Sequence, residues 1–378
     1  MKEVSLTIDA SNIRAGGGLT HLKEILSSQA FLNSKFTRVL VWASQATLDS
    51  LKDFDKLEKK HHAYLEQGYL KISIWQYFIL PREVKSTNSL LFIPGTGSSR
   101  MPYITMFRNL LPLESRETRR YFFSKTWLRL LLLREIHKYS FKNASGIICL
   151  NDYCRNHLKG HVNVNSSDLK VILHGLSDKF KKNIGVNKRK TGDVFRLLYV
   201  SVVDVYKHQW EIVRAVKDLV EKGKRIELIL VGPSYPPALK KLNEELNRKP
   251  ELNHAIRYTG KIPYEELVDV YSSADAFIFA STCETYGMVV TEAMGMGLPI
   301  LCSKYSSMRS NFGSSAIYFN PLDQESIKSN ITLLEESNEL REELSAKALE
   351  FAEKRTWENC AGATFDYLFD KYQEICVE

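Results

Sequence analysis

The segment CETYGMVVTEAMGMGLP, residues 283–299, places two carboxylates around a turn and the start of an apolar helix. Glu284 precedes the turn, and Glu292 follows eight positions later, inside a helical pattern that begins near Gly287. A strand-like run over 275–281 leads into the segment. The turn therefore falls at the carboxyl end of a strand, where open α/β sheets bind their ligands.

The types and spacing of these residues predict a site for one elongated ligand. The first N–H groups of a helix lack intrahelical acceptors and carry the positive end of the helix dipole, so those of Gly287, Met288 and Val289 would bind a diphosphate. A carboxylate repels phosphate but accepts hydrogen bonds from hydroxyls, so Glu284 and Glu292 would each hold a sugar ring. In an arbitrary sequence, two glutamates at this spacing are more simply a solvated loop residue and a buried, paired one.

The longer stretch LVDVYSSADAFIFASTCETYGMVVTEAMGMGLPI, residues 267–300, resembles the signature of the retaining glycosyltransferases of family 4, whose fold is GT-B. The resemblance implies that Glu284 is a catalytic residue that contacts the transferred sugar, and that Glu292 contacts the ribose of the nucleotide. It also implies retaining transfer of a hexose-type sugar from a nucleoside diphosphate sugar. No D-x-D-type segment is evident, so we expect no metal, and the resemblance implies no cofactor.

A second match to the family lies in LYVSVVDVYKHQ, where Lys207 occupies the loop after a strand. The resemblance implies that this lysine is catalytic and contacts the diphosphate. The chemistry calls for a cation there, because the leaving nucleoside diphosphate gathers negative charge. The family usually has an arginine about six residues before this lysine, and this chain has Ser201 there. We expect Ser201 to lie in the donor-binding site. Either His208 or Arg309 could supply the missing charge.

Two shorter segments continue the resemblance on the donor side. LILVGP, residues 228–233, and RYTGKIPYEEL, residues 257–267, occur in the order that the family has them. The resemblance implies that Gly232 contributes to donor binding and that Ile262 and Tyr264 contact the base.

The N-terminal part carries a weaker signal in SNIRAGGGLTHL, residues 11–22, where three glycines join the first strand to the first helix. A tight turn is sufficient to explain them. The resemblance makes Gly17 and Gly18 a loop that faces the donor phosphates and the acceptor. The histidine that the family often has in this domain is not evident, and Arg108 lies near its position. The base that activates the acceptor is therefore unassigned, and the departing phosphate oxygen could take the proton.

Strand-like and helix-like segments alternate along the chain, which is typical of parallel sheets covered by helices. A long helix is expected over 116–141, and the polar, basic stretch 181–193 is the predicted linker. The expected strands lie at 4–10, 38–44, 69–75, 89–95, 103–107, 144–150 and 169–175, and then at 195–203, 226–232, 255–260, 275–281 and 298–303.

This alternation predicts an α/β protein of two domains. The resemblance specifies the GT-B fold, in which two Rossmann-like, doubly wound domains face a central cleft. We expect an acceptor-binding domain over 1–182 and a nucleotide-sugar-binding domain over 191–355. A terminal helix over 356–378 is expected to pack back on the N-terminal domain.

The composition is that of a soluble globular protein, with 378 residues, 44% hydrophobic and 25% charged. The six cysteines form no C-x-x-C pair and no cluster with histidines along the sequence, so neither a disulfide framework nor a zinc site is expected. His137 and His174 are expected to be structural. The N-terminus shows no secretory h-region, and the leucine-rich run 128–136 is too short to span a bilayer, so a cytoplasmic location is expected.

The net charge of +8 is concentrated in residues 100–142, which hold ten Lys or Arg against three Glu. Aromatic residues and leucines accompany these charges, a combination that suits an anionic membrane surface or a lipid-phosphate acceptor. No aromatic-rich nucleic-acid motif appears, so nucleic acid is not an expected partner. The plainer interpretation is a helix with one core face and one solvated basic face.

Together with the resemblance, this charge pattern predicts a peripheral enzyme at the inner face of the cytoplasmic membrane. It would bind a nucleotide sugar and a lipid-linked glycan in the synthesis of a surface polysaccharide such as O-antigen, capsule or lipopolysaccharide. Two alternatives remain open: a sugar-nucleotide epimerase of the same fold, and a non-catalytic nucleotide-sugar-binding protein, which Ser201 keeps in consideration.

Overall fold

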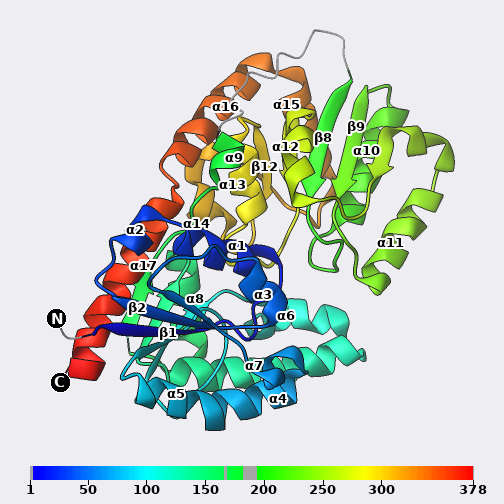
Figure 1. Cartoon of the computed structure of the whole chain (residues 1–378). Coiled ribbons are helices and arrows are strands. Elements are labelled where there is room, and N and C mark those ends of the chain that lie inside the picture. The colour runs from blue at the N-terminus through cyan, green and yellow to red at the C-terminus, as the bar shows by residue number, and fades with distance from the viewer. Residues whose placement is uncertain (1–2, 166–167, 182–193, 378) are drawn as a thin grey trace. The chain divides into compact units, whose positions relative to one another are not determined.

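The computed structural model of the chain describes residues 3–165, 168–181 and 194–377. The chain forms two compact units. The N-terminal unit comprises Met1–Ser115, Phe123–Gly175 and Arg355–Glu378, and the C-terminal unit comprises Arg116–Phe122 and Leu176–Lys354. Each unit holds one parallel sheet with helices around it (Figure 1). The expected α/β class, with two doubly wound domains, is confirmed.

The N-terminal unit is built on a seven-stranded parallel sheet in the order β3-β2-β1-β4-β5-β6-β7. The strands are β1 (Ser5–Asp9), β2 (Arg38–Trp42), β3 (Leu57–Lys60), β4 (Leu90–Ile93), β5 (Tyr103–Phe107), β6 (Gly146–Cys149) and β7 (Leu169–Val171). In the central pair, Ser5 of β1 lies opposite Arg38 of β2. All residues of the central strands β1, β4, β5 and β6 are buried, because helices cover both faces of the sheet.

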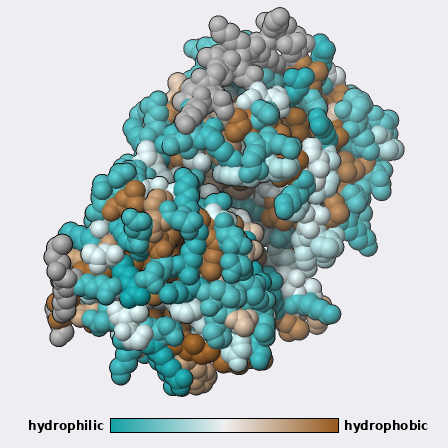
Figure 2. All heavy atoms as spheres, viewed as in Figure 1, coloured by the Kyte–Doolittle hydropathy of each residue, from teal (hydrophilic) through white to brown (hydrophobic). Residues whose placement is uncertain are grey.

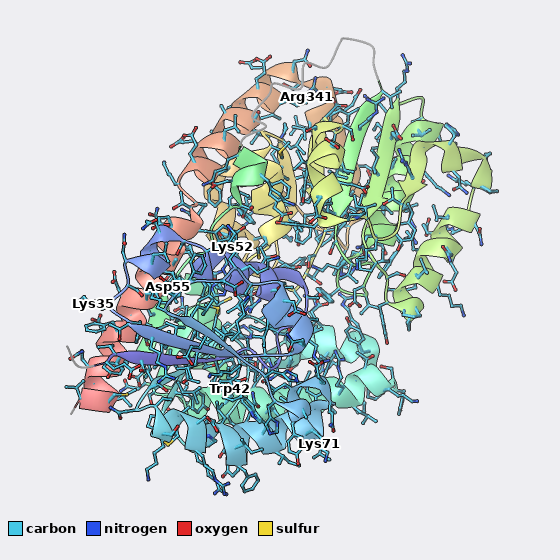
Figure 3. All side chains as sticks on the ribbon, in the orientation of Figure 1. Lys35, Trp42, Lys52, Asp55, Lys71 and Arg341 are labelled. Atoms are coloured by element: carbon cyan, nitrogen blue, oxygen red, sulfur yellow. The ribbon has the colours of Figure 1, made fainter. Side chains whose placement is uncertain are left out.

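Helices α1 and α5 lie on opposite faces of this sheet (Figure 1). Trp42, labelled in Figure 3, lies in a core cluster with Trp75, and their ring centroids are 5.6 Å apart. The helices of this unit are α1 (Gly16–Leu26), α2 (Gln29–Leu32), α3 (Gln45–Asp49), α4 (Tyr69–Ile74), α5 (Leu80–Ser86), α7 (Lys125–Lys142), α8 (Asp152–His161) and α17 (Trp357–Tyr372).

The expected strand at 69–75 is wrong, because Tyr69–Ile74 form α4 and Trp75 begins a π-helical turn. Ile72 and Trp75 are buried three positions apart, whereas Tyr69 and Leu70 are exposed, which is helical rather than alternating spacing. The edge of the sheet is instead β3, a short strand that the sequence analysis missed. Three of its four residues, Glu58, Lys59 and Lys60, are charged and half-buried, as is common in edge strands.

The expected long helix over 116–141 is interrupted. A short helix, α6 (Ser115–Thr118), and a 3₁₀ turn end before Phe123, whose φ of +58° lies in the left-handed region. Ser124 then caps α7, since its side chain accepts a hydrogen bond from the N–H of Trp127 at 3.1 Å. The residues before this break, Arg116–Phe122, belong to the C-terminal unit.

The C-terminal unit is built on a six-stranded parallel sheet in the order β10-β9-β8-β11-β12-β13. The strands are β8 (Phe195–Val200), β9 (Ile226–Val231), β10 (Ile256–Tyr258), β11 (Ala276–Phe279), β12 (Ile300–Ser303) and β13 (Ile317–Phe319). The helices are α9 (Asp178–Lys181), α10 (Gln209–Glu221), α11 (Pro236–Asn247), α12 (Leu267–Ser272), α13 (Met288–Gly295), α14 (Met308–Phe312), α15 (Gln324–Glu336) and α16 (Asn338–Glu353). The order changes direction at β8 and β11, which is the switch point where doubly wound sheets bind ligands.

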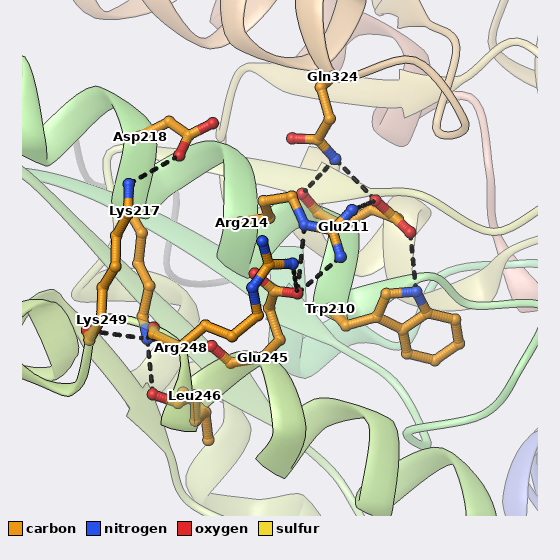
Figure 4. Close-up of polar contacts among 10 residues, drawn as sticks. All are labelled: Trp210, Glu211, Arg214, Lys217, Asp218, Glu245, Leu246, Arg248, Lys249 and Gln324. Atoms are coloured by element: carbon orange, nitrogen blue, oxygen red, sulfur yellow. Dashed lines mark hydrogen bonds and ion pairs between the residues drawn. The ribbon is translucent and has the colours of Figure 1, made fainter.

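A polar network joins α10 to α11 (Figure 4). Arg214 donates to Glu245 at 2.7 Å. The buried ammonium of Lys217 donates to the backbone carbonyls of Leu246 and Arg248, each at 2.7 Å, and so caps the end of α11. This network fixes α10, which begins two residues after Lys207.

The terminal helix α17 belongs to the N-terminal unit and packs against α1 and α2. The rings of Phe31 and Phe365 lie 5.4 Å apart, and Glu358 accepts a hydrogen bond from the N–H of Gln29 at 3.0 Å.

Arg341, labelled in Figure 3, lies on α16 in the C-terminal unit. Of the predicted linker 181–193, all but residue 181 lies outside the described residues.

The structure places the change between the units earlier than the sequence analysis did, at Gly175 and Leu176 rather than between 182 and 191. The C-terminal unit also takes in Arg116–Phe122, which the sequence analysis assigned to the N-terminal domain. Tyr121 ties this segment to the C-terminal unit by donating a hydrogen bond to Asp204 at 2.7 Å.

Among the described residues, no helix combines the length and apolar character that crossing a membrane requires.

Candidate functional site

An ion pair between Lys207 and Glu284 lies at the carboxyl ends of β8 and β11. Lys207 follows β8 and is 6% exposed, and Glu284 follows β11 and is half-buried. The ammonium donates to Oε1 of Glu284, and the hydroxyl of Ser281 donates to the same oxygen at 2.7 Å. The structure therefore brings the two predicted catalytic residues into direct contact.

The backbone around each partner is fixed by short-range contacts. The N–H of Lys207 donates to the carbonyl of Asp204 at 3.0 Å, and His208 adopts a left-handed φ of +54° that turns the chain into α10. The hydroxyl of Ser306 bridges the backbone of Glu284, accepting from its N–H at 2.8 Å and donating to its carbonyl at 2.7 Å. Ser306 was not anticipated, because its role depends on a loop that only the fold brings near.

Helix α13 begins at the predicted place, with Gly287 at its N-cap. Gly287 has a φ of +88°, a conformation that favours glycine. The N–H of Val290 makes the first bond of the helix, to the carbonyl of Gly287 at 2.9 Å. The N–H groups of Met288 and Val289 precede that bond and so lack an acceptor within the helix. They form the donor end of α13, four and five residues beyond Glu284.

Glu292 lies inside α13 and is 6% exposed. Its carboxylate accepts hydrogen bonds from the hydroxyls of Tyr271 at 3.0 Å and Tyr264 at 3.4 Å. Burial raises the pKa of Glu292 to about 7, and the hydrogen bond from Tyr271 and the charge of Lys179 oppose this shift. The predicted hydroxyl acceptor is thus a buried carboxyl poised near neutral pH.

Lys179 and Tyr271 are residues of this site that the sequence analysis missed. The ammonium of Lys179 lies 3.0 Å from the ring centroid of Tyr264 and donates to the carbonyl of that residue at 2.7 Å. Tyr271 stands inside the recognised signature, but its spacing gave no sign that its hydroxyl reaches Glu292. Lys179 is more than a hundred positions from Glu292 along the chain, so no local pattern could reveal it.

Ser201 and Gly232 lie side by side at the ends of β8 and β9. The N–H of Ser201 donates to the carbonyl of Val231 at 2.8 Å. A Cβ on Gly232 would lie 2.1 Å from the carbonyl oxygen of Ser201, and Gly232 has a φ of +140°. Glycine is therefore required where these two loops meet. Ile262 is half-buried in the loop that leads to Tyr264.

The structure excludes one of the two replacements considered for the missing arginine. Burial lowers the pKa of His208 to about 3, with a smaller contribution from the charge of Arg120, so the ring is neutral and supplies no cation. Its Nε2 lies 3.2 Å from the hydroxyl of Thr282. Arg309 is exposed, and its guanidinium lies 5.0 Å from the ring centroid of Tyr318.

Gly17, Gly18 and Arg108 come together in the N-terminal unit. Gly17 and Gly18 lie in the first turn of α1, and a Cβ on Gly18 would lie 2.6 Å from Nη2 of Arg108. Arg108 also donates to the carbonyl of Pro94 at 3.0 Å, and burial lowers the pKa of its guanidinium to about 10. Glycine at position 18 therefore allows the guanidinium to lie against the helix backbone.

A comparison with protein families matches part of the chain that lies mostly in the C-terminal unit. Residues 180–351 match the family model of the glycosyl transferases group 1. This group 1 segment contains Lys207, Glu284, Glu292 and the start of α13.

Curated relatives of the chain include glycosyltransferases of several pathways. O-antigen chain mannosyltransferase B of Escherichia coli is 32% identical over 111 residues, which are 29% of this chain and 29% of the relative. The sulfoquinovosyl transferase SQD2 of Arabidopsis thaliana is 32% identical over 39% of this chain and 28% of the relative. D-inositol 3-phosphate glycosyltransferase of Thermomonospora curvata is 26% identical over 53% of this chain and 47% of the relative. The matched segments therefore span less than two thirds of each relative's own length.

Solved structures of low sequence identity share the fold along nearly the whole chain. The Anabaena protein HepE, solved with UDP and glucose, superimposes with a TM-score of 0.70 at 16% identity and covers 98% of this chain and 100% of its own. Sucrose-phosphate synthase from Thermosynechococcus elongatus gives a TM-score of 0.75 at 16% identity, with the same coverage. WaaG, a glycosyltransferase involved in lipopolysaccharide biosynthesis, gives 0.69 at 13% identity, covering 97% and 99%. The expected GT-B fold is thereby confirmed.

Proposed function

We propose that this protein is a retaining glycosyltransferase that moves a hexose-type sugar from a nucleoside diphosphate sugar to an acceptor hydroxyl. The observation that carries the proposal is the Lys207–Glu284 ion pair, set beside the free N–H groups of α13 with Glu292 buried further along that helix. One cationic group, one anion-binding helix end and two carboxylates match the diphosphate, the sugar and the ribose of a single ligand.

Each residue has a defined task in this proposal. The ammonium of Lys207 carries three donors, so it can hold Glu284 and a diphosphate oxygen together. The N–H groups of Met288 and Val289 bind the diphosphate, and Glu284 accepts hydrogen bonds from hydroxyls of the transferred sugar. Glu292 accepts hydrogen bonds from the ribose. Tyr264 and Ile262 lie on the loop proposed to receive the base.

The chemical step balances without a further reagent. The bond between the anomeric carbon and the diphosphate oxygen breaks, and the electron pair leaves with the nucleoside diphosphate. The acceptor oxygen bonds to the anomeric carbon on the face that the diphosphate vacates, and its proton passes to the departing phosphate oxygen. Lys207 and the α13 amides stabilise the negative charge of the leaving group, and the proposed step requires no metal or cofactor.

The proposed acceptor is a lipid-linked glycan, and helix α7 supports a peripheral position on an anionic membrane. Four apolar side chains on one face of α7, at spacings of four, four and three, are between 41% and 63% exposed: Leu128, Leu132, Ile136 and Tyr139. Exposed Lys125 and Arg129 lie on the same helix. Hydrophobic side chains also reach the surface of the N-terminal unit near α4 and α5 (Figure 2). An apolar stripe beside cations suits insertion into anionic headgroups. We place this surface at the inner face of the cytoplasmic membrane, in the synthesis of a surface polysaccharide.

Substitution of Glu284 tests the catalytic assignment. We expect Glu284→Gln to abolish transfer while the variant still binds the nucleoside diphosphate, because the α13 amides and Lys207 remain. A thermal-shift panel with UDP, GDP, dTDP, ADP and CMP identifies the base first, since a bound nucleotide raises the melting temperature by mass action. Glu342→Gln, at an exposed position on α16 of the same unit, is the matched control and should retain full transfer.

The same assays separate the alternatives. A wild-type chain that binds a nucleotide but shows neither transfer nor donor hydrolysis would be the non-catalytic binding protein that Ser201 permits. An epimerase would convert the sugar nucleotide without releasing nucleoside diphosphate. Either result contradicts the proposed transfer reaction.

A further inference from the structure

A second cluster of reactive side chains lies within the N-terminal unit. His21 of α1, His174 in the segment after β7 and Cys360 of α17 are all buried, and their ligand atoms lie within 4.8 Å of one another. The three residues come from parts of the sequence more than 150 positions apart. None of them takes part in the donor site described above.

His21 gives the first indication that this cluster binds something. Its side chain is 0% exposed, and neither ring nitrogen has a hydrogen-bond partner among the residues that the structure describes. A neutral imidazole carries one donor and one acceptor, and both are costly to bury without partners. Coordination of a metal ion by one nitrogen would remove part of this cost.

The backbone holds the other two ligands in place. A Cβ on Gly175 would lie 2.3 Å from the backbone nitrogen of Trp357, so only glycine lets the segment after His174 touch the start of α17. That contact brings His174 beside Cys360, one turn into the helix. The ring of Trp357 covers the cluster, with its centroid 5.7 Å from His21 and 5.4 Å from His174.

We propose that His21, His174 and Cys360 form a three-ligand site for one Zn²⁺ ion, which ties α17 to α1 and to the end of β7. Two imidazole nitrogens and one thiolate are a donor set that zinc favours. Zinc bonds of this kind place ligand atoms about 3.5 Å apart, so the cluster closes with side-chain shifts of about 1 Å. The fourth position is left for a water or a small anion.

Burial favours the neutral form of each of these three side chains. Burial lowers the pKa of His174 to about 3, and burial also lowers that of His21, with Arg108 contributing to both shifts. Burial raises the pKa of the Cys360 thiol to about 12, and the ion would displace that proton. The thiolate formed would offset the charge of Arg108.

Metal content tests this proposal without reference to activity. The full chain, purified without a histidine tag, should contain about one Zn²⁺ per chain by mass spectrometry. His21→Gln and Cys360→Ser should lower this content at least about tenfold. The matched controls are His137→Gln and Cys154→Ser, a buried histidine and a buried cysteine of the same unit outside the cluster, which should keep the metal.

If a variant fails to fold, the absorption spectrum of the cobalt-loaded protein tests the site without that variant. The wild type and Cys154→Ser, loaded with Co²⁺, should show a thiolate-to-cobalt charge-transfer band, because Cys360 is present in both. The proposal is overturned if the wild type holds no metal as purified and none after incubation with Zn²⁺ or Co²⁺, since the cluster then serves packing only. Metal content at the wild-type level in Cys360→Ser also overturns it.

Discussion

Replacing Glu292 by glutamine should change how the stability of the protein depends on pH. The folded state raises the pKa of this carboxyl from 4.5 to about 7, chiefly through burial. The folded chain therefore binds the proton of Glu292 more tightly than the unfolded chain does. This difference stabilises the folded state fully below pH 4.5, and the stabilisation is lost as the pH rises through 7. A shift of one pKa unit corresponds to 1.36 kcal/mol. The protonation of Glu292 therefore adds about 2.5 kcal/mol to the free energy of unfolding at pH 5 and close to zero at pH 8.

Urea unfolding of the wild type and of Glu292→Gln at several values between pH 5 and pH 8 measures this effect. Glutamine does not titrate and can still accept from Tyr271, so the stability of the variant relative to the wild type should rise by about 2.5 kcal/mol from pH 5 to pH 8. Glu265→Gln, at an exposed position, should show no such trend. A stability difference that stays constant across this range would refute the reasoning about Glu292.

Three further substitutions test other parts of the structure. Lys217→Met should lower the free energy of unfolding by about 2–3 kcal/mol in urea titrations, because the buried ammonium donates to carbonyls at the end of α11. Gly232→Ala should cost more than about 2 kcal/mol, measured in the same way, because its Cβ would lie 2.1 Å from the carbonyl oxygen of Ser201. Leu132→Glu, on the exposed face of α7, should abolish co-sedimentation with anionic vesicles. Leu333→Glu, at a leucine of the C-terminal unit that is 49% exposed, should not. Equal binding by both variants would contradict a membrane role for α7.

The sequence was sufficient to predict much of the fold, because buried parallel strands and the helices between them leave strong local patterns. The start of α13 at Gly287 is a clear case, since glycine, an apolar run and the flanking strands all point to one turn. The segment 69–75 shows the limit of this approach. A short apolar run suits a strand or a helix, and only its packing around Trp75 decides between them.

The candidate site was predictable where its residues share one segment and not where tertiary contacts assemble it. Glu284 and Glu292 could be named because the segment that holds them resembles a family signature, whereas the contact of Glu284 with Lys207 depends on the parallel alignment of β8 with β11. Lys179 reaches Tyr264 from a short helix far away in the chain. The cluster of His21 with Cys360 has no local signal at all, which is why the sequence analysis expected no zinc site.

The central claim is that Lys207 and Glu284 serve one reaction, the transfer of a sugar from a nucleoside diphosphate. Release of nucleoside diphosphate, measured with the full chain, the nucleotide sugar chosen by the thermal-shift panel and a lipid-linked glycan acceptor, tests it most directly. We predict acceptor-dependent release by the wild type, none by Lys207→Met or Glu284→Gln, and full release by the control Glu342→Gln. Release by Lys207→Met or Glu284→Gln at the wild-type rate, or none by the wild type with any sugar nucleotide that binds, would contradict the account.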